Sequence, residues 1–162
     1  MSDKIILASK SKVRKEILDK HEILCEVKPS NVDEDVVKES LIKRSASPEI
    51  ISKNLAELKA NKVSLNQKDR LVLGADSVID LAGELISKPE DREEALMILK
   101  KLNGKKHNLI SSVCISRNGS MIWNYTDKAE LIMKYFSEED LKVYLSKISD
   151  EALYAYNVYQ IE

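Results

Sequence analysis

The sequence predicts an α/β fold in which a mixed, twisted sheet is flanked by helices. Three observations support this prediction. Short apolar runs at residues 4–8, 23–27 and 71–73 are bounded by small or polar residues, which is typical of buried strands. These runs alternate with segments of helical periodicity, as in α/β domains. Later in the chain, Ala82-Gly83 and Asn118-Gly119 predict hairpins, so part of the sheet should be antiparallel.

Composition restricts the class of protein. The 162 residues suffice for a single domain, residues 1–162, with a sizeable core. A net charge of −1 gives no global attraction to nucleic acid or membrane, so any anion site must be local. No apolar run is long enough for a membrane span or signal peptide. Cys25 and Cys114 lack CxxC or Cys/His spacing, which argues against a disulfide framework or zinc site and favours a reducing, cytoplasmic location.

The loop after the first strand carries hydroxyls and cations. Residues 4–8 run into Ser9-Lys10-Ser11-Lys12-Val13-Arg14, where a helix is predicted to begin. A helix start with serine hydroxyls and an arginine one turn in can bind a phosphate group. For Ser11 alone, an ordinary N-cap is the simpler interpretation. There is no GxxxxGK[ST] or GxGxxG motif, so P-loop and Rossmann sites are not expected.

The next stretch combines an acidic run with a helix. Val32-Asp33-Glu34-Asp35 follows the second strand, and a solvated turn is the usual explanation. Alternatively, one of these carboxylates could hold a divalent cation together with Asp76. Ser47-Pro48-Glu49 then starts a helix. Lys59 follows the apolar side of that helix and is either a snorkelling surface lysine, which its position alone favours, or a phosphate ligand.

Asp76 is the central candidate for a residue that carries out chemistry. The apolar run 71–73 is followed by Gly74 and Ala75, which allow close approach to the backbone, and then by Asp76 at the expected strand end. Open α/β sheets place their chemistry at such ends. An aspartate that merely satisfies turn amides is the alternative.

The remaining elements are predicted from turns and caps. Residues 78–81 and 84–86 form a hairpin, and Pro89 holds Lys88 extended. A helix covers 91–102, a strand 107–115, one or two strands 121–133, and a last helix begins after Ser137.

Together these residues resemble the Maf-type nucleoside triphosphate pyrophosphatases, which are related in fold to the inosine triphosphate pyrophosphatases. The matching segments run in order along nearly the whole chain: LASKSKVR at 7–14 (family LASxSPxR), VDE at 32–34, LAELKA at 55–60 (LAxxKA), GADS at 74–77 (GADT), KP at 88–89 and LNGKKH at 102–107 (LSGxxH).

The resemblance implies two lobes around a nucleotide cleft and hydrolysis between the α- and β-phosphates. Asp76 matches the general base, and Glu34 matches a carboxylate near a divalent metal, Mg²⁺ or Mn²⁺. The positions that match phosphate-binding residues are Ser9, Ser11, Arg14, Lys59 and Lys88. A non-catalytic nucleotide-binding regulator of cell division is the alternative function. The oligomeric state is open, with a homodimer as one alternative.

The chain also departs from the family pattern. Lys12 stands where the family has a proline, and the resemblance implies that Val13, Ser77 and Glu162 occupy the positions at which family members select the base. This set matches neither the dTTP/UTP-selective residues (Arg, Thr, Gln) nor the 7-methyl-GTP-selective residues (Trp, Gln, Glu). A carboxylate at Glu162 would favour a purine or modified base that presents N–H donors. Family members continue with further strands beyond this point, so the domain is expected to lack their C-terminal segment.

Overall fold

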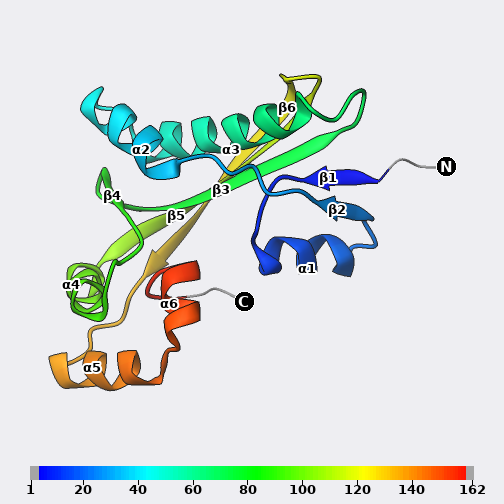
Figure 1. Ribbon diagram of the computed structural model, residues 1–162. Coiled ribbons are helices and arrows are strands. Elements are labelled where there is room, and N and C mark those ends of the chain that lie inside the picture. The colour runs from blue at the N-terminus through cyan, green and yellow to red at the C-terminus, as the bar shows by residue number, and fades with distance from the viewer. Residues whose placement is uncertain (1–3, 160–162) are drawn as a thin grey trace. The chain divides into compact units, whose positions relative to one another are not determined.

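The computed structural model describes residues 4–159 and has the predicted α/β architecture (Figure 1). The strands are β1 (Ile5–Leu7), β2 (Cys25–Val27), β3 (Val72–Leu81), β4 (Glu84–Ile86), β5 (Lys106–Arg117) and β6 (Ser120–Ile132). The helices are α1 (Lys12–Lys20), α2 (Glu34–Lys43), α3 (Pro48–Ser64), α4 (Arg92–Leu102), α5 (Glu138–Lys147) and α6 (Asp150–Tyr156). Within these residues no helix is long and apolar enough to cross a membrane.

The sheet is mixed, as predicted. Its strand order is β2-β1-β3-β5-β6, and β4 pairs with β3. β1 is parallel to both β2 and β3, whereas β3 and β4 are antiparallel. The turns at Ala82-Gly83 and Asn118-Gly119 have positive φ at both residues, which is the backbone that two-residue hairpins favour. β6 is a single strand of 13 residues.

The helix starts follow the predicted capping chemistry. The hydroxyls of Ser47 and Ser137 accept hydrogen bonds from Ile50 and Asp140 at the starts of α3 and α5. Asp91 accepts from the Glu94 amide at 2.7 Å, and Glu94 in turn accepts from the Glu90 amide at 2.8 Å, which ties down the start of α4.

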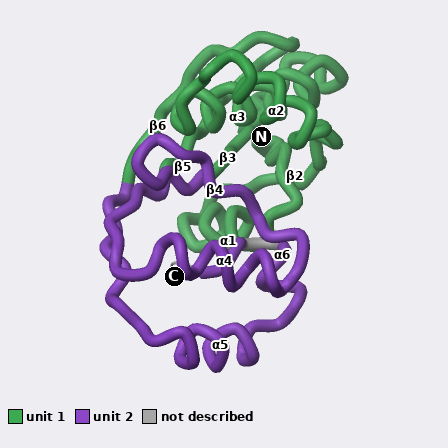
Figure 2. Tube along the Cα trace, turned by 90° about the vertical axis from the view of Figure 1, so that its left-hand side faces the viewer, with its two compact units in different colours: residues 1–77, 110–128 green, residues 78–109, 129–162 purple. Residues whose placement is uncertain are grey.

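The chain divides into two compact units (Figure 2). The first contains residues 1–77 and 110–128, and the second contains residues 78–109 and 129–162. Each has its own apolar core. In the first unit, Ile6, Ala8, Val63 and Val72 pack together, and Ala56, Ala60 and Cys114 form a further cluster. The second unit's core includes Ile79, Ile98, Leu99, Leu102, Leu141 and Leu153.

Three predictions about individual elements need correction. β3 does not end at Leu73, so Asp76 lies inside a ten-residue strand and not at a strand end. Gly74 and Ala75 are compatible with extended backbone, and here their small size serves packing. The acidic run is not a solvated turn, because Asp33 caps α2 and Glu34 is its first residue. Neither α2 nor the short α6 was predicted, because α2 buries none of its residues fully and α6 has only seven residues, so neither has a clear apolar pattern.

Candidate active site

Asp76 and Lys59 form a buried ion pair in the first unit. Both residues are only 6% exposed. The Lys59 ammonium lies 3.0 Å from Asp76 Oδ1 and 3.3 Å from the Ala75 carbonyl oxygen, and it also contacts Glu34 Oε1. These three acceptors match the three N–H donors of a lysine. Lys59 is therefore not a snorkelling surface residue, and the interpretation that its position alone favoured is wrong.

The close approach of α3 to β3 depends on Gly74. A Cβ atom at this position would lie 2.3 Å from the Ala56 carbonyl oxygen and 2.8 Å from the Ala60 nitrogen. Both are backbone atoms of α3, which cannot move away individually. The absence of a side chain at Gly74 thus lets the helix pack close to the strand, and Lys59, one residue before Ala60, reaches Asp76 from the helix.

The surroundings of Asp76 act on its pKa in both directions, and the net effect raises the pKa. Burial raises the pKa of this carboxyl group above its ordinary value, and the negative charge of Glu34 acts in the same direction. The positive charges of Lys59 and Lys38 oppose this shift and lower the pKa. Asp76 Oδ2 is buried and has no hydrogen-bond partner among residues 4–159. Asp76 therefore presents one oxygen to Lys59 and retains one that can accept a proton or a ligand.

The loop between β1 and α1 is arranged by its serines and Arg14. Arg14 Nη1 donates to Ser9 Oγ at 3.0 Å, and the Ser11 amide donates to the same oxygen at 3.2 Å. Ser11 is the N-cap of α1 and accepts from the Arg14 amide, as the simpler interpretation expected. Burial lowers the pKa of Arg14, whereas the charges of Asp76 and Glu34 oppose this change. Arg14 thus lies within the electrostatic field of both carboxylates.

The described residues provide only part of the ligand set of a divalent cation. No group of three or more His, Cys, Asp or Glu side chains suited to a metal occurs in the described part of the chain. Two carboxylates meet at Lys59, however, and Asp76 Oδ2 is a buried oxygen without a partner there. Mg²⁺ is commonly bound by one or two carboxylates together with substrate phosphates and waters. The donor set therefore suits an ion that arrives with a phosphate substrate.

The other predicted site residues are placed as follows. Val13 is half-buried on α1, next to Arg14, and Ser77 is exposed on β3 with its hydroxyl 3.1 Å from Ser111 Oγ of β5. Lys88 is an exposed residue between β4 and α4 in the second unit, and its convergence with Arg14 and Lys59 stays a prediction. Glu162 lies outside the described residues.

Lys38 was missed by the sequence analysis. It is half-buried on α2, four residues after Glu34, and its charge acts on Asp76. Helical residues four apart lie on the same face. This spacing would have identified Lys38 if the acidic run had been recognised as a helix start.

The sequence matches the family described as Maf-like protein over residues 4–162. Among curated proteins, it is 68% identical over 162 residues to a nucleoside triphosphate pyrophosphatase of Pelagibacter ubique, covering all of this chain and 83% of that protein. It is 36% identical to a nucleoside triphosphate pyrophosphatase of Ruegeria sp. and 33% identical to a 7-methyl-GTP pyrophosphatase of Rhizobium etli. In both cases the match covers the whole chain and 81% of the relative.

Two solved structures of low sequence identity also align with this chain. A HAM1 protein from Coxiella burnetii aligns with a TM-score of 0.48 and 15% identity, covering 78% of this chain and 70% of that one. The Ham1 protein of Staphylococcus aureus aligns with a TM-score of 0.42 and 16% identity, covering 80% and 70%.

Proposed function

This chain belongs to the Maf-like protein family, and we propose that it is a nucleoside triphosphate pyrophosphatase. It would hydrolyse the bond between the α- and β-phosphates and release a nucleoside monophosphate and pyrophosphate. The names of the relatives support this class of reaction. The observation that carries the proposal is Asp76, a buried carboxylate with one unpartnered oxygen among residues 4–159, close to Lys59 and within the field of Arg14.

Asp76 would act as the general base. Its Oδ2 atom would accept a proton from the attacking water while the new bond to the α-phosphorus forms and the bridging bond to the β-phosphate breaks. A general base works best when its pKa is closer to the working pH than that of an ordinary aspartate. Burial moves the pKa of Asp76 in that direction, and Lys59 keeps the carboxylate oriented through Oδ1.

Arg14 and the serines would hold the negative charge of the triphosphate. The Arg14 guanidinium has donors beyond the one that Ser9 engages, and it lies at the start of a helix, where anions are stabilised. Lys59 would balance the charges of Asp76 and Glu34, so that the phosphates are not repelled. For Lys59 itself to bind a phosphate, a phosphate oxygen would have to replace one of its three present acceptors.

A divalent cation, Mg²⁺ or Mn²⁺, is proposed to be held by the carboxyl groups of Glu34 and Asp76 together with the substrate. When bound, it would supply Lewis-acid polarisation of the phosphate and of the attacking water. Glu34 adds a negative charge beside Asp76, which favours binding of a cation at this position.

We infer that the substrates are modified or non-canonical nucleotides, with the base preference set around Val13, Ser77 and Glu162. The relatives include proteins named for nucleoside triphosphates in general and for 7-methyl-GTP, so both substrate types belong in a test panel. Cys25 and Cys114 are both free thiols, which agrees with a reducing cytoplasm as the proposed compartment.

The proposal is tested by assaying canonical and modified nucleotides with Mg²⁺ or Mn²⁺, with pyrophosphate and nucleoside monophosphate measured as products. Replacing Asp76 by Asn should lower kcat by roughly 10²–10⁴-fold, because the base is lost while the shape is kept. Asp35→Asn is the matched control, since Asp35 is an exposed carboxylate next to Glu34, and it should keep most of the activity.

Two results would overturn the proposal. One is turnover of Asp76→Asn within a few-fold of wild type. The other is nucleotide binding by the wild-type chain without release of pyrophosphate under any metal condition, which would favour a non-catalytic nucleotide-binding regulator.

A further inference from the structure

The segment from Lys28 to Asp33 joins β2 to α2 and delivers Glu34 to the candidate site; it is called the Glu34 loop below. One end is fixed to the sheet, because the Lys28 amide donates to the Leu7 carbonyl oxygen at 3.0 Å. The other end is the N-cap of α2, where Asp33 Oδ1 accepts from the Val36 amide at 3.3 Å. Between these ends the loop must keep a defined path, because Glu34 contacts Lys59 immediately after it.

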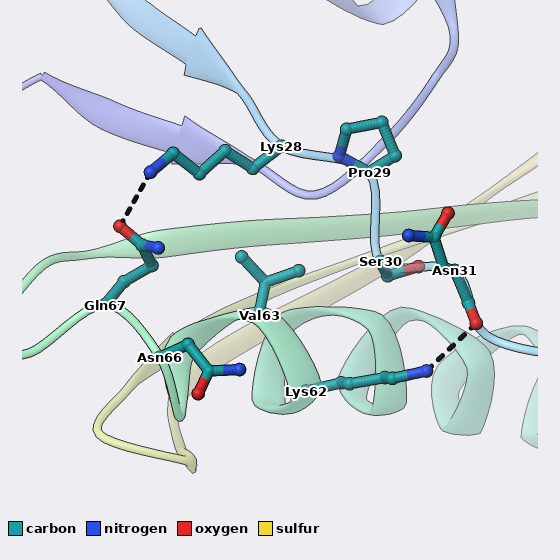
Figure 3. A pocket seen from close by; sticks show the side chains of 8 residues that line it. All are labelled: Lys28, Pro29, Ser30, Asn31, Lys62, Val63, Asn66 and Gln67. Atoms are coloured by element: carbon teal, nitrogen blue, oxygen red, sulfur yellow. Dashed lines mark hydrogen bonds between the residues drawn. The ribbon is translucent and has the colours of Figure 1, made fainter.

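The middle of the Glu34 loop lies over a solvent-open pocket of about 330 Å³ (Figure 3). Of the eight residues that line this pocket in Figure 3, only Val63 of α3 and Pro29 of the loop have apolar side chains. An open pocket contributes few of the close contacts that fix a well-packed segment. On the side of the pocket, polar links are therefore the contacts that hold the middle of the loop.

Two lysines provide such links. Lys28 Nζ donates to Gln67 Oε1 at 3.0 Å, and Lys62 Nζ donates to the Asn31 carbonyl oxygen at 2.9 Å (Figure 3). Asn31 has φ of 52°, in the left-handed region that asparagine adopts more readily than most residues other than glycine. The Lys62 link therefore holds the carbonyl group of a residue that is suited to this turn of the loop.

Lys62 and Lys59 lie three residues apart on α3, which makes them neighbours on the helix surface. Lys59 contacts the Glu34 side chain, and Lys62 holds the main chain three residues earlier. We propose that Lys62 is a positioning residue, which fixes the Glu34 loop to α3 and thereby sets the position of Glu34 relative to Asp76. Its catalytic consequence rests on the proposed function, whereas its effect on the loop does not.

The test compares Lys62→Met, which keeps the aliphatic stem but removes the donors, with Lys62→Arg, which keeps a donor. Lys53→Met is the matched control, because Lys53 is an exposed lysine of the same helix that pairs with Glu49 and not with the loop. The first measurement is residue-resolved amide hydrogen exchange. In Lys62→Met the Val36 and Val37 amides, both bonded to Asp33, should exchange roughly two- to tenfold faster, the range that one hydrogen bond supports.

The second measurement is the concentration of Mg²⁺ or Mn²⁺ that gives half-maximal pyrophosphatase activity. It should rise several-fold in Lys62→Met and return towards the wild-type value in Lys62→Arg, while Lys53→Met stays at the wild-type value. The melting temperature should stay nearly constant in all three variants, because an exposed lysine contributes little to global stability.

Unchanged exchange at Val36 and Val37 in Lys62→Met would overturn the proposal at the level of the loop. Faster exchange with an unchanged metal requirement would overturn the link to Glu34. If the wild-type chain has no pyrophosphatase activity, the proposed function fails, and the exchange comparison alone still decides whether Lys62 holds the loop.

Discussion

At the scale of single residues, the proposed catalytic role of Asp76 is combined with a cost to the fold. A buried carboxylate is disfavoured in its ionised form, and a partner lysine offsets only part of the cost. Here burial is the largest single influence on the pKa of Asp76, and the pKa is raised although Lys59 and Lys38 lower it. Active sites commonly contain such energetically unfavourable buried groups. The contribution of Asp76 to stability should therefore depend on pH.

Asp76→Asn should become more stable relative to wild type as the pH rises from about 4 to 7. Because the folded-state pKa is raised, Asp76 contributes most to stability below its unfolded pKa of about 3.9, and the contribution is lost as the pH rises through the folded-state value. Asparagine does not ionise, so it avoids this loss. The measurement is the free energy of unfolding from denaturant titrations at several pH values, without added metal.

Asp35→Asn serves as the control for removal of a carboxylate from an exposed position on α2. A difference between Asp76→Asn and wild type that stays constant or narrows with rising pH would contradict the prediction.

At the scale of elements, the candidate site depends on the contact between α3 and β3. The helix contributes Lys59 and Lys62, and its Ala56 and Ala60 face the strand at Gly74. Small residues on both sides bring the two backbones close together. The distance between α3 and β3 therefore controls the ion pair between Lys59 and Asp76.

Gly74→Ala should destabilise the protein by roughly 1–3 kcal/mol, the range for overpacked interiors, and should also lower activity. The nearest atom to the added methyl group is the Ala56 carbonyl oxygen at 2.3 Å, so the helix as a whole has to move. The measurements are denaturant unfolding and steady-state kinetics.

A second substitution distinguishes backbone from side-chain crowding at this position. Adding Ala60→Gly to Gly74→Ala removes the Ala60 methyl group but leaves the Ala56 carbonyl oxygen in place, so it should not restore stability. Full recovery in the double variant would show that the side chain of Ala60, and not the backbone of α3, limits the space.

At the scale of the whole molecule, the predicted site residues are divided between the two units. Asp76, Lys59, Glu34, Ser9 and Arg14 belong to the first unit, and Lys88 belongs to the second. Each unit has its own apolar core. The contribution of the second unit to substrate handling can therefore be tested separately from the ion pair in the first.

Lys88→Ala should lower kcat/KM by about 10- to 100-fold, which corresponds to the loss of one hydrogen bond to a charged group. The melting temperature should change little, because Lys88 is exposed. Lys101→Ala is the matched control in the same unit, since Lys101 is also exposed and pairs with Glu84. A large loss of stability with normal kinetics would instead assign Lys88 a structural role.

The sequence by itself was sufficient for the fold class and for most helix starts and turns. These features depend on local chemistry: Ser47, Asp91 and Ser137 cap helices because their side chains reach nearby amides, and Asn118-Gly119 adopts the backbone that a tight turn requires. The ordered motifs likewise grouped Asp76, Glu34, Lys59 and Arg14, and the structure places all four in the first unit, where Lys59 contacts both carboxylates and their charges act on Arg14.

Only the tertiary structure decided what these residues contact. The position of Lys59 along α3 favoured a solvent-exposed side chain. In the structure its ammonium group is buried and is paired with Asp76 of β3 and Glu34 of α2. Asp76 was expected at a strand end, yet β3 continues through it, because Gly74 accommodates the α3 backbone and does not end the strand. Burial, ion pairing and close packing arise between segments that are distant in sequence, and local patterns contain no information about those distances.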